Sequence, residues 1–247
     1  MPNPFEAKTG AKKRVGVIQP GSVQQIRQMA GVELLSPQEM EEKKIINPSF
    51  SNKEFLNTFR EIRTKLIQGS HKRNFVAMVC SMVHGGGATF NAVNLAAAFA
   101  LDQSKTSLLI DCNLYEPTLD KLFNLNPEYG LTDYLEDPTL SIDDIIYASG
   151  VQRLRVVPAG SFREAGAEYF SSERMAAFIE AVKKRYPDRF IFIDAPPAGL
   201  SAEGRIVAEL SDCAILVAPY GRVTLSQIQA GIDAVGKEKV AGIIFNS

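Results

Sequence analysis

The stretch CSMVHGGGATFNAVNLA, residues 80–96, decides the fold class of this 247-residue chain. An apolar run that ends at Cys80 leads into three consecutive glycines, a hydroxyl residue and an alanine-rich stretch. A buried strand, a glycine-rich turn and a helix in this order direct backbone N–H groups and the positive end of the helix dipole toward one point. The stretch therefore predicts a phosphate-binding loop.

One position of this loop departs from the usual phosphate-loop pattern. The pattern G-x-x-x-x-G-K-[ST] places a lysine directly before the hydroxyl residue, whereas here Ala88 precedes Thr89. A cation at this position offsets phosphate charge, and removing one such transition-state contact lowers the rate by about 10²–10³. We therefore expect weak nucleotide binding and a larger loss of chemistry than of folding.

Six apolar runs alternate with segments of helical length after a first amphipathic helix at residues 52–68. The expected strands are Phe75–Cys80, Ser107–Asp111, Leu154–Pro158, Phe190–Asp194, Ala214–Ala218 and Val240–Phe245. Strands that are apolar on both faces and separated by helices are typical of a mostly parallel sheet with helices on each side. We predict a single α/β domain over residues 51–247. Residues 1–50, rich in proline and charge, are expected to form an arm that is partly flexible or docked on the domain surface.

The composition limits the classes of partner. The 27 basic and 28 acidic residues leave a formal charge of −1, so no overall field favours nucleic acid. No apolar run reaches the roughly 20 residues of a membrane helix, and the first residues, MPNPFEAKTGAKKR, lack the apolar core of a signal peptide. The three cysteines show no metal-ligand spacing. We expect a cytoplasmic protein with reduced thiols and no nucleic-acid partner.

Polar residues stand where two of the expected strands end. Asp111 and Asn113 follow one apolar run, and Asp194 ends another. Open α/β sheets bind ligands at the carboxyl ends of their strands, and Mg²⁺ prefers oxygen ligands. The predicted metal ligands are Thr89, Asp111 and Asp194. The predicted nucleotide-binding residues are Gly85, Gly86, Gly87, Ala88, Thr89, Phe90 and Asn113.

Several motifs together resemble the bacterial tyrosine kinases of exopolysaccharide and capsule synthesis, which are relatives of the Min/Par P-loop ATPases. The motifs are GGGAT (85–89), LLIDCNLYEP (108–117) and FIFIDAPP (190–197), with NTFREIRTKL (57–66) upstream and VVPAG (156–160) and EYFSS (168–172) between. The resemblance runs from about Ser51 to the last residue. It implies a P-loop NTPase-like fold, with ATP or ADP and Mg²⁺ as cofactors.

The motifs depart from the family pattern at functional positions. The Walker A lysine falls on Ala88, a second lysine of the Min/Par relatives falls on Val83, and the second aspartate of a D-x-D motif is Asn113. Asp111 occupies the position of the aspartate that the family uses to activate the attacking hydroxyl. Because the lysine and the second aspartate are missing, we expect the catalytic role of Asp111 to be vestigial. The family's tyrosine-rich C-terminal segment does not follow GIIFNS (242–247), so we expect no autophosphorylation.

The resemblance also implies partners. The family's E-x-x-R-x-x-R helix packs against a neighbouring subunit, and Asn57, Arg60 and Arg63 occupy its three positions. A second copy or a kinase-competent relative is one expected partner, and the cytoplasmic segment of a membrane protein that controls polysaccharide chain length or export is another. Recruitment to the inner face of the membrane would follow. The alternative is a solvated basic helix face.

Three functions remain open. The first, which we favour because Ala88, Phe90 and Asn113 all alter the site, is a pseudokinase that acts as a regulatory or binding partner in exopolysaccharide or capsule assembly. The second is an active ATP-dependent tyrosine kinase or ATPase with a non-standard phosphate loop. The third is a Min/Par-like positioning protein.

Overall fold

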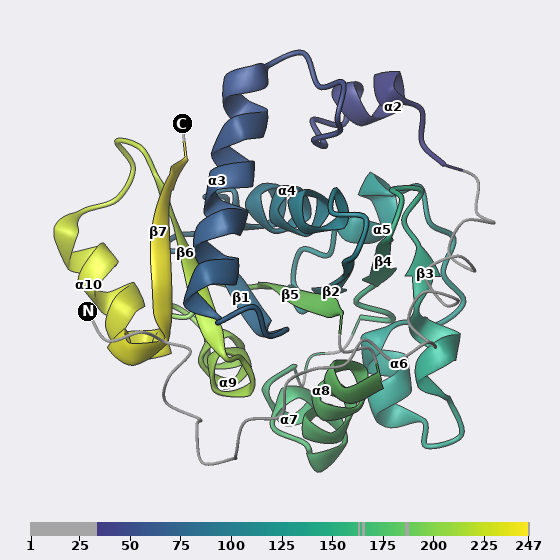
Figure 1. The fold of residues 1–247 in the computed structure, drawn as a ribbon. Helices are drawn as coiled ribbons and strands as arrows, with labels where there is room; N and C mark the ends of the chain where they lie inside the picture. The colour runs from purple at the N-terminus through teal and green to yellow at the C-terminus, as the bar shows by residue number, and fades with distance from the viewer. Residues whose placement is uncertain (1–33, 163, 165, 186–187, 247) are drawn as a thin grey trace.

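The computed structural model describes residues 34–162, 164, 166–185 and 188–246. Seven strands form one sheet in the order β3-β4-β2-β5-β1-β6-β7 (Figure 1). They are β1 Val76–Ser81, β2 Thr106–Asp111, β3 Tyr147–Ala148, β4 Leu154–Val157, β5 Arg189–Ala195, β6 Cys213–Pro219 and β7 Val240–Asn246. Neighbouring strands pair in parallel except β3 and β4, which are antiparallel. The predicted mostly parallel sheet is confirmed.

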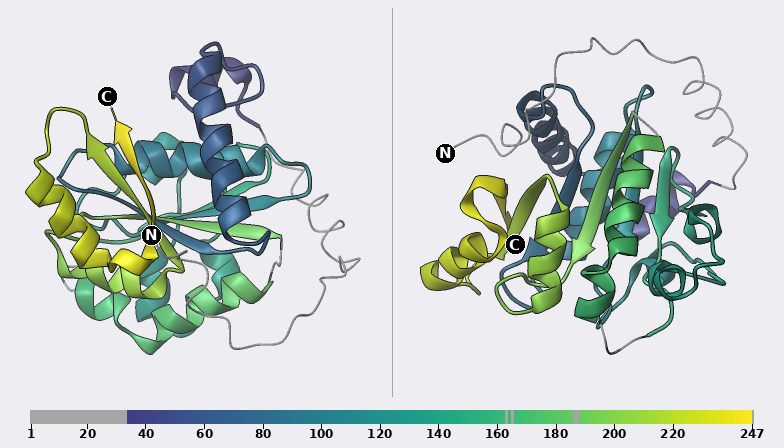
Figure 2. Two further views of the ribbon diagram at one scale, coloured as in Figure 1. Left: turned by 60° about the vertical axis from the view of Figure 1, so that its left-hand side comes forward. Right: turned by 90° about the horizontal axis from the view of Figure 1, so that it is seen from below.

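Helices cover both faces of this sheet. They are α2 Pro37–Glu42, α3 Lys53–Gly69, α4 Ala88–Ala100, α5 Leu119–Leu122, α6 Leu131–Glu136, α7 Gly166–Phe170, α8 Glu173–Arg185, α9 Ala202–Leu210 and α10 Leu225–Val235, with short 3₁₀ turns η2 Ile142–Ile145 and η3 Lys237–Lys239. Helices α3 and α4 lie on one face, and α7, α8 and α9 lie on the other (Figures 1 and 2). The predicted arrangement of one domain with helices on each face is also confirmed.

The central strand β1 shows why the apolar runs in this sequence are continuous. Its residues are all buried. Val76, Met78 and Cys80 pack into the core beneath α8 and α9, whereas Ala77 and Val79 pack into the core beneath α4. Successive side chains of a strand point to opposite faces. Because both faces are covered, an alternating polar pattern is absent from this strand.

Residues 44–46, within the described segment before α3, contact α4. Ile45 and Ile46 are fully buried. The Asn94 side chain of α4 accepts a hydrogen bond from the Ile46 N–H at 2.9 Å and donates one to the Lys44 carbonyl at 3.0 Å. This part of the predicted arm is therefore docked on the domain, and residues 1–33 lie outside the described residues.

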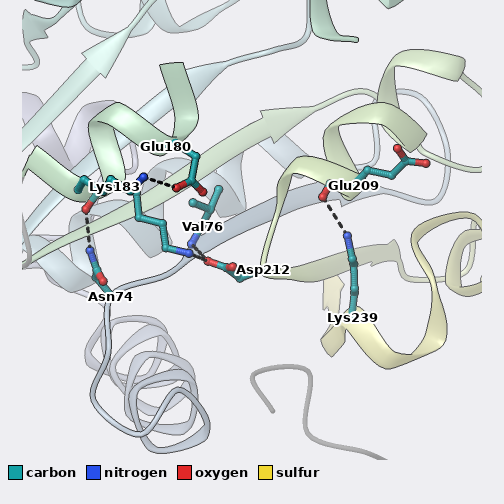
Figure 3. Close-up of polar contacts among 8 residues, drawn as sticks. Asn74, Val76, Glu180, Lys183, Glu209, Asp212 and Lys239 are labelled. Carbon is teal, nitrogen blue, oxygen red and sulfur yellow. Dashed lines mark hydrogen bonds and ion pairs between the residues drawn. The ribbon is translucent and has the colours of Figure 1, made fainter. Parts of the chain in front are cut away.

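A polar network holds the amino ends of β1 and β6 together (Figure 3). The Lys183 amine of α8 lies 2.5 Å from the Asp212 carboxylate, which also accepts a hydrogen bond from the Val76 N–H at 2.9 Å. The Asn74 side chain donates to the Lys183 carbonyl at 3.1 Å. This network lies at the edge of the sheet opposite to the glycine-rich loop.

Candidate phosphate-loop site

The three glycines of the loop between β1 and α4 meet two backbone requirements, a positive φ and a close approach to a neighbouring side chain. Gly85 and Gly87 have φ values of 62° and 90°, in the left-handed region that L side chains rarely adopt. A Cβ on Gly86 would overlap the Ser81 side chain. The loop conformation therefore explains all three consecutive glycines.

Helix α4 begins at Ala88, directly behind this loop. Its N-cap is Gly87, so no capping side chain bonds to the first N–H groups of the helix. Uncapped N–H groups at a helix N-terminus are an anion-binding site when a glycine loop precedes them. Gly85, Gly86, Gly87, Ala88 and Thr89 thus form one continuous loop and helix start, and their binding of a phosphate remains a prediction.

Asp111 and Asp194 lie side by side at the carboxyl ends of β2 and β5, where they are direct partners in the strand register. Asp111 accepts hydrogen bonds from the backbone N–H groups of Asn113 at 3.0 Å and of Thr118 and Leu119 at 3.3 Å each. Burial raises the pKa of Asp111 to about 7, and these N–H groups act in the opposite direction. Asn113 therefore contacts Asp111 through its backbone N–H, and the predicted contact of Asn113 with a nucleotide remains a prediction.

Asp194 is the least satisfied group of the site. Both of its carboxylate oxygens are buried without a well-formed hydrogen bond among the described residues. Burial and the neighbouring Asp111 raise the pKa of Asp194 well above its ordinary value, and the nearby Thr89 side chain offsets only part of this rise. A buried carboxylate without partners is costly unless it neutralises or meets a cation.

These residues fit a magnesium ion that is shared with a nucleotide. No group of three or more His, Cys, Asp or Glu side chains in the described chain is placed to hold a metal by itself. Mg²⁺ in nucleotide sites takes one or two protein oxygens and completes its shell with phosphates and water. The unsatisfied Asp194 carboxylate beside Thr89, at the end of the cradle, supplies such a set.

The Phe90 ring turns out to have a partner on α3. Its centroid lies 5.7 Å from that of Phe55, and Phe55 in turn contacts Phe50 and Phe59. We name these four rings the aromatic cluster. The cluster connects the first turn of α4 with α3, and the predicted contribution of Phe90 to a nucleotide pocket remains a prediction.

Two residues at this site were missed by sequence reasoning, which identified no replacement for the absent lysine. One Arg222 guanidinium nitrogen donates to the Gly85 carbonyl at 3.3 Å. The Asn246 side chain donates to the Gly86 carbonyl at 3.3 Å and lies against Gly87. Both follow or end strands parallel to β1, so their position at a strand's carboxyl end was the signal that could have found them.

The relatives of this chain decide its family. No family model matches the sequence. The tyrosine-protein kinase CpsD of Streptococcus agalactiae serotype III is 32% identical over 191 residues, which cover 76% of this chain and 80% of CpsD. This chain belongs to the bacterial tyrosine-protein kinases.

Solved structures agree with this assignment. The BceF tyrosine kinase domain superposes with a TM-score of 0.70 at 26% identity, covering 94% of this chain and 99% of that domain. The cell-division ATPase MinD of Pyrococcus furiosus shares the fold, with a TM-score of 0.56 at 22% identity over 69% of this chain and 70% of MinD. Among the described residues of this tyrosine-kinase family member, no helix is long and apolar enough to cross a membrane.

The predicted partner residues of this kinase-family domain lie in two environments. Asn57 and Arg60 are exposed on α3. Arg63 is half-buried, and one of its guanidinium nitrogens donates to the Ala98 carbonyl of α4 at 2.8 Å. Arg63 therefore has a role within the domain, and the partner role of all three residues remains a prediction.

Proposed function

We propose that this chain is a catalytically impaired member of the bacterial tyrosine kinases, a pseudokinase that acts as a regulatory or binding partner in exopolysaccharide or capsule synthesis and export. The observation that carries the proposal is Ala88 at the first position of α4. The cradle beside it is formed, but the position where a lysine grips the outer phosphates has only a methyl group.

The remaining residues support binding of ATP or ADP with Mg²⁺ better than phosphoryl transfer. The loop N–H groups would hold phosphate oxygens, and Thr89 and Asp194 would hold the metal, which offsets phosphate charge when bound. Asp111 would accept the proton of an attacking hydroxyl, and a pKa of about 7 suits a general base near neutral pH. The missing cation at position 88 lowers the rate of transfer by about 10²–10³.

An active ATP-dependent tyrosine kinase or ATPase is the second candidate. It is favoured by the retained set of Thr89, Asp111 and Asp194, of which Asp194 lacks a well-formed hydrogen bond among the described residues. A Min/Par-like positioning protein is supported by the likeness to the MinD fold alone.

The partners we propose come from the family resemblance. They are a second copy or a kinase-competent relative, and the cytoplasmic segment of a membrane protein for polysaccharide chain length or export. Such a partner would bring a cytoplasmic protein to the inner face of the membrane. The near-zero net charge supports a protein partner rather than nucleic acid.

ATP turnover tests the proposal. We expect the unmodified protein to release no phosphate from ATP above background and to incorporate no phosphate on tyrosine. Ala88→Lys should tighten ADP binding by about tenfold, because it restores a charge-assisted contact. Steady turnover by the unmodified protein that Asp111→Ala abolishes would overturn the pseudokinase proposal in favour of the active kinase.

A further inference from the structure

We propose that Arg222 replaces the missing lysine as the cation for the outer phosphates of a nucleoside di- or triphosphate in this loop. The inference rests on the proposed nucleotide site and deepens it, because it names the side chain that recognises the charged end of the ligand. The residue lies far from the loop in sequence, in the turn between β6 and α10.

The fold holds Arg222 beside the cradle. Strand β6 pairs directly with β1, with Ser81 opposite Val217, so both strands deliver the following turns to the same edge of the sheet. Gly221 turns the chain with a φ of 68°, and the Arg222 N–H closes this turn on the Pro219 carbonyl at 3.2 Å. The turn is thus a fixed support for the side chain.

The Arg222 guanidinium already contacts the loop at the glycine that faces open space. One of its nitrogens donates to the Gly85 carbonyl, and no atom lies within 4 Å of a Cβ built on Gly85. Arg222 is exposed, and a guanidinium has five N–H donors. A long exposed side chain anchored by one neutral carbonyl can turn toward an anion without breaking a packed contact.

Charge supplies the reason for this movement. A nucleotide brings several negative charges to a site that already contains Asp111 and Asp194, and Ala88 supplies no compensation. A guanidinium forms bidentate hydrogen bonds with two phosphate oxygens, whereas a carbonyl offers it only one acceptor oxygen. The Asn246 amide, which bonds to the Gly86 carbonyl, is a neutral donor on the same side of the loop.

Position also separates the effect of Arg222 from that of a lysine on α4. A lysine at position 88 would rise from the first turn of the cradle helix itself, whereas Arg222 reaches the loop from the neighbouring turn at the Gly85 end. We therefore expect Arg222 to support phosphate binding without restoring efficient transfer. This pattern would make the protein a nucleotide-binding pseudokinase.

Titration of ADP with Mg²⁺ against the purified chain tests the inference. Arg222→Ala should weaken binding by about tenfold to a hundredfold, the loss of one charged hydrogen-bonding contact. Arg222→Lys should retain part of the affinity. The matched control is Arg205→Ala, because Arg205 is also exposed and also donates one bond to a carbonyl at 3.3 Å, that of Ala198; its affinity should stay within about twofold of the parent.

A compensating variant completes the test. Ala88→Lys combined with Arg222→Ala should recover the affinity lost in Arg222→Ala, since either cation can face the phosphates. Equal ADP affinity in the parent and in Arg222→Ala would overturn the inference, as would an absence of ADP binding by the parent at millimolar concentration. Neither result concerns turnover, which decides the pseudokinase proposal separately.

Discussion

At the scale of single residues, Asp194 is expected to lower the stability of the unliganded protein and to raise its affinity for a cation. Its carboxylate is buried without a well-formed hydrogen bond among the described residues, and burial and Asp111 raise its pKa more than the Thr89 side chain lowers it. A buried carboxylate of this kind destabilises the unliganded protein, and it can stabilise the complex by binding a cation. Its effect on stability and its effect on binding should therefore have opposite signs.

Asp194→Asn is expected to stabilise the unliganded protein. The substitution removes a buried ionisable group while keeping its shape, so the free energy of unfolding should rise by about 1–3 kcal/mol at neutral pH. Urea denaturation without Mg²⁺ or nucleotide measures this change. The variant should in turn lose any stabilisation that Mg²⁺ with ADP gives the parent. A destabilised variant would contradict the unsatisfied state of Asp194.

The pH dependence of this gain follows from the direction of the pKa shift. The pKa of Asp194 lies well above its ordinary value in the folded state, so between its unfolded and folded pKa values the folded protein binds more protons. The parent then loses stability as pH rises, whereas the asparagine cannot titrate. The advantage of Asp194→Asn should be near zero at about pH 4 and should grow toward pH 7 and above. A constant difference across this range would contradict the raised pKa.

At the scale of elements, six of the seven strands could be predicted to within one residue at each end, because buried parallel strands are continuous apolar runs. Strand β3 could not, since it has only two residues, both partly exposed, and its pairing depends on β4. The strand-end aspartates were predictable for the same reason as the strands. Arg222 was not, because a turn residue gains its role only when β6 lies beside β1.

Helix α3 separates two arginines that the sequence presents as one motif. Arg60 is exposed, while Arg63 bonds to the carbonyl of Ala98 near the end of α4. We expect Arg63→Ala to lower the free energy of unfolding by about 1–3 kcal/mol, because it removes a charged hydrogen bond. Arg60→Ala should leave stability within about 0.5 kcal/mol.

Self-association should show the reverse order. If α3 contacts a neighbour, Arg60→Ala should weaken it by about 2–5 kcal/mol when the charge is buried at the interface. Sedimentation velocity of the parent and Arg60→Ala, with and without a co-expressed membrane partner, measures the change. The exposed ion pair of Lys65 with Glu61 on the same helix offers the control Lys65→Ala. Unchanged assembly in Arg60→Ala would remove the partner role from this arginine.

At the scale of the whole molecule, the two ends of the parallel strands have different roles. The carboxyl edge carries the unsatisfied site, and the amino edge carries the network of Lys183, Asp212 and the Val76 N–H (Figure 3). The Asp212 and Lys183 side chains are only 14% and 28% exposed. We therefore expect this network, rather than the surface ion pairs, to contribute to global stability.

Asp212→Ala tests this division. It leaves the Lys183 amine and the Val76 N–H without their acceptor, so the free energy of unfolding should fall by about 2–4 kcal/mol. The control is Glu180→Ala on α8, the helix that carries Lys183. Glu180 pairs with Lys184, and their side chains are 60% and 77% exposed. This control should change the free energy of unfolding by less than about 1 kcal/mol. Thermal and urea denaturation of both variants give the comparison. Equal effects would contradict a larger contribution of Asp212 to global stability.

The Asn94 side chain links the segment before α3 to the first turn of α4. The Asn94 amide donates both to the Phe90 carbonyl, in the first turn of α4, and to the Lys44 carbonyl, so one side chain joins the start of the cradle helix to residues 44–46. Cleavage by trypsin after Lys43 or Lys44 requires this segment to detach from α4. A phosphate ligand that steadies the first turn should slow that detachment, so protease resistance at these two lysines would report occupancy of a loop that the protease never touches.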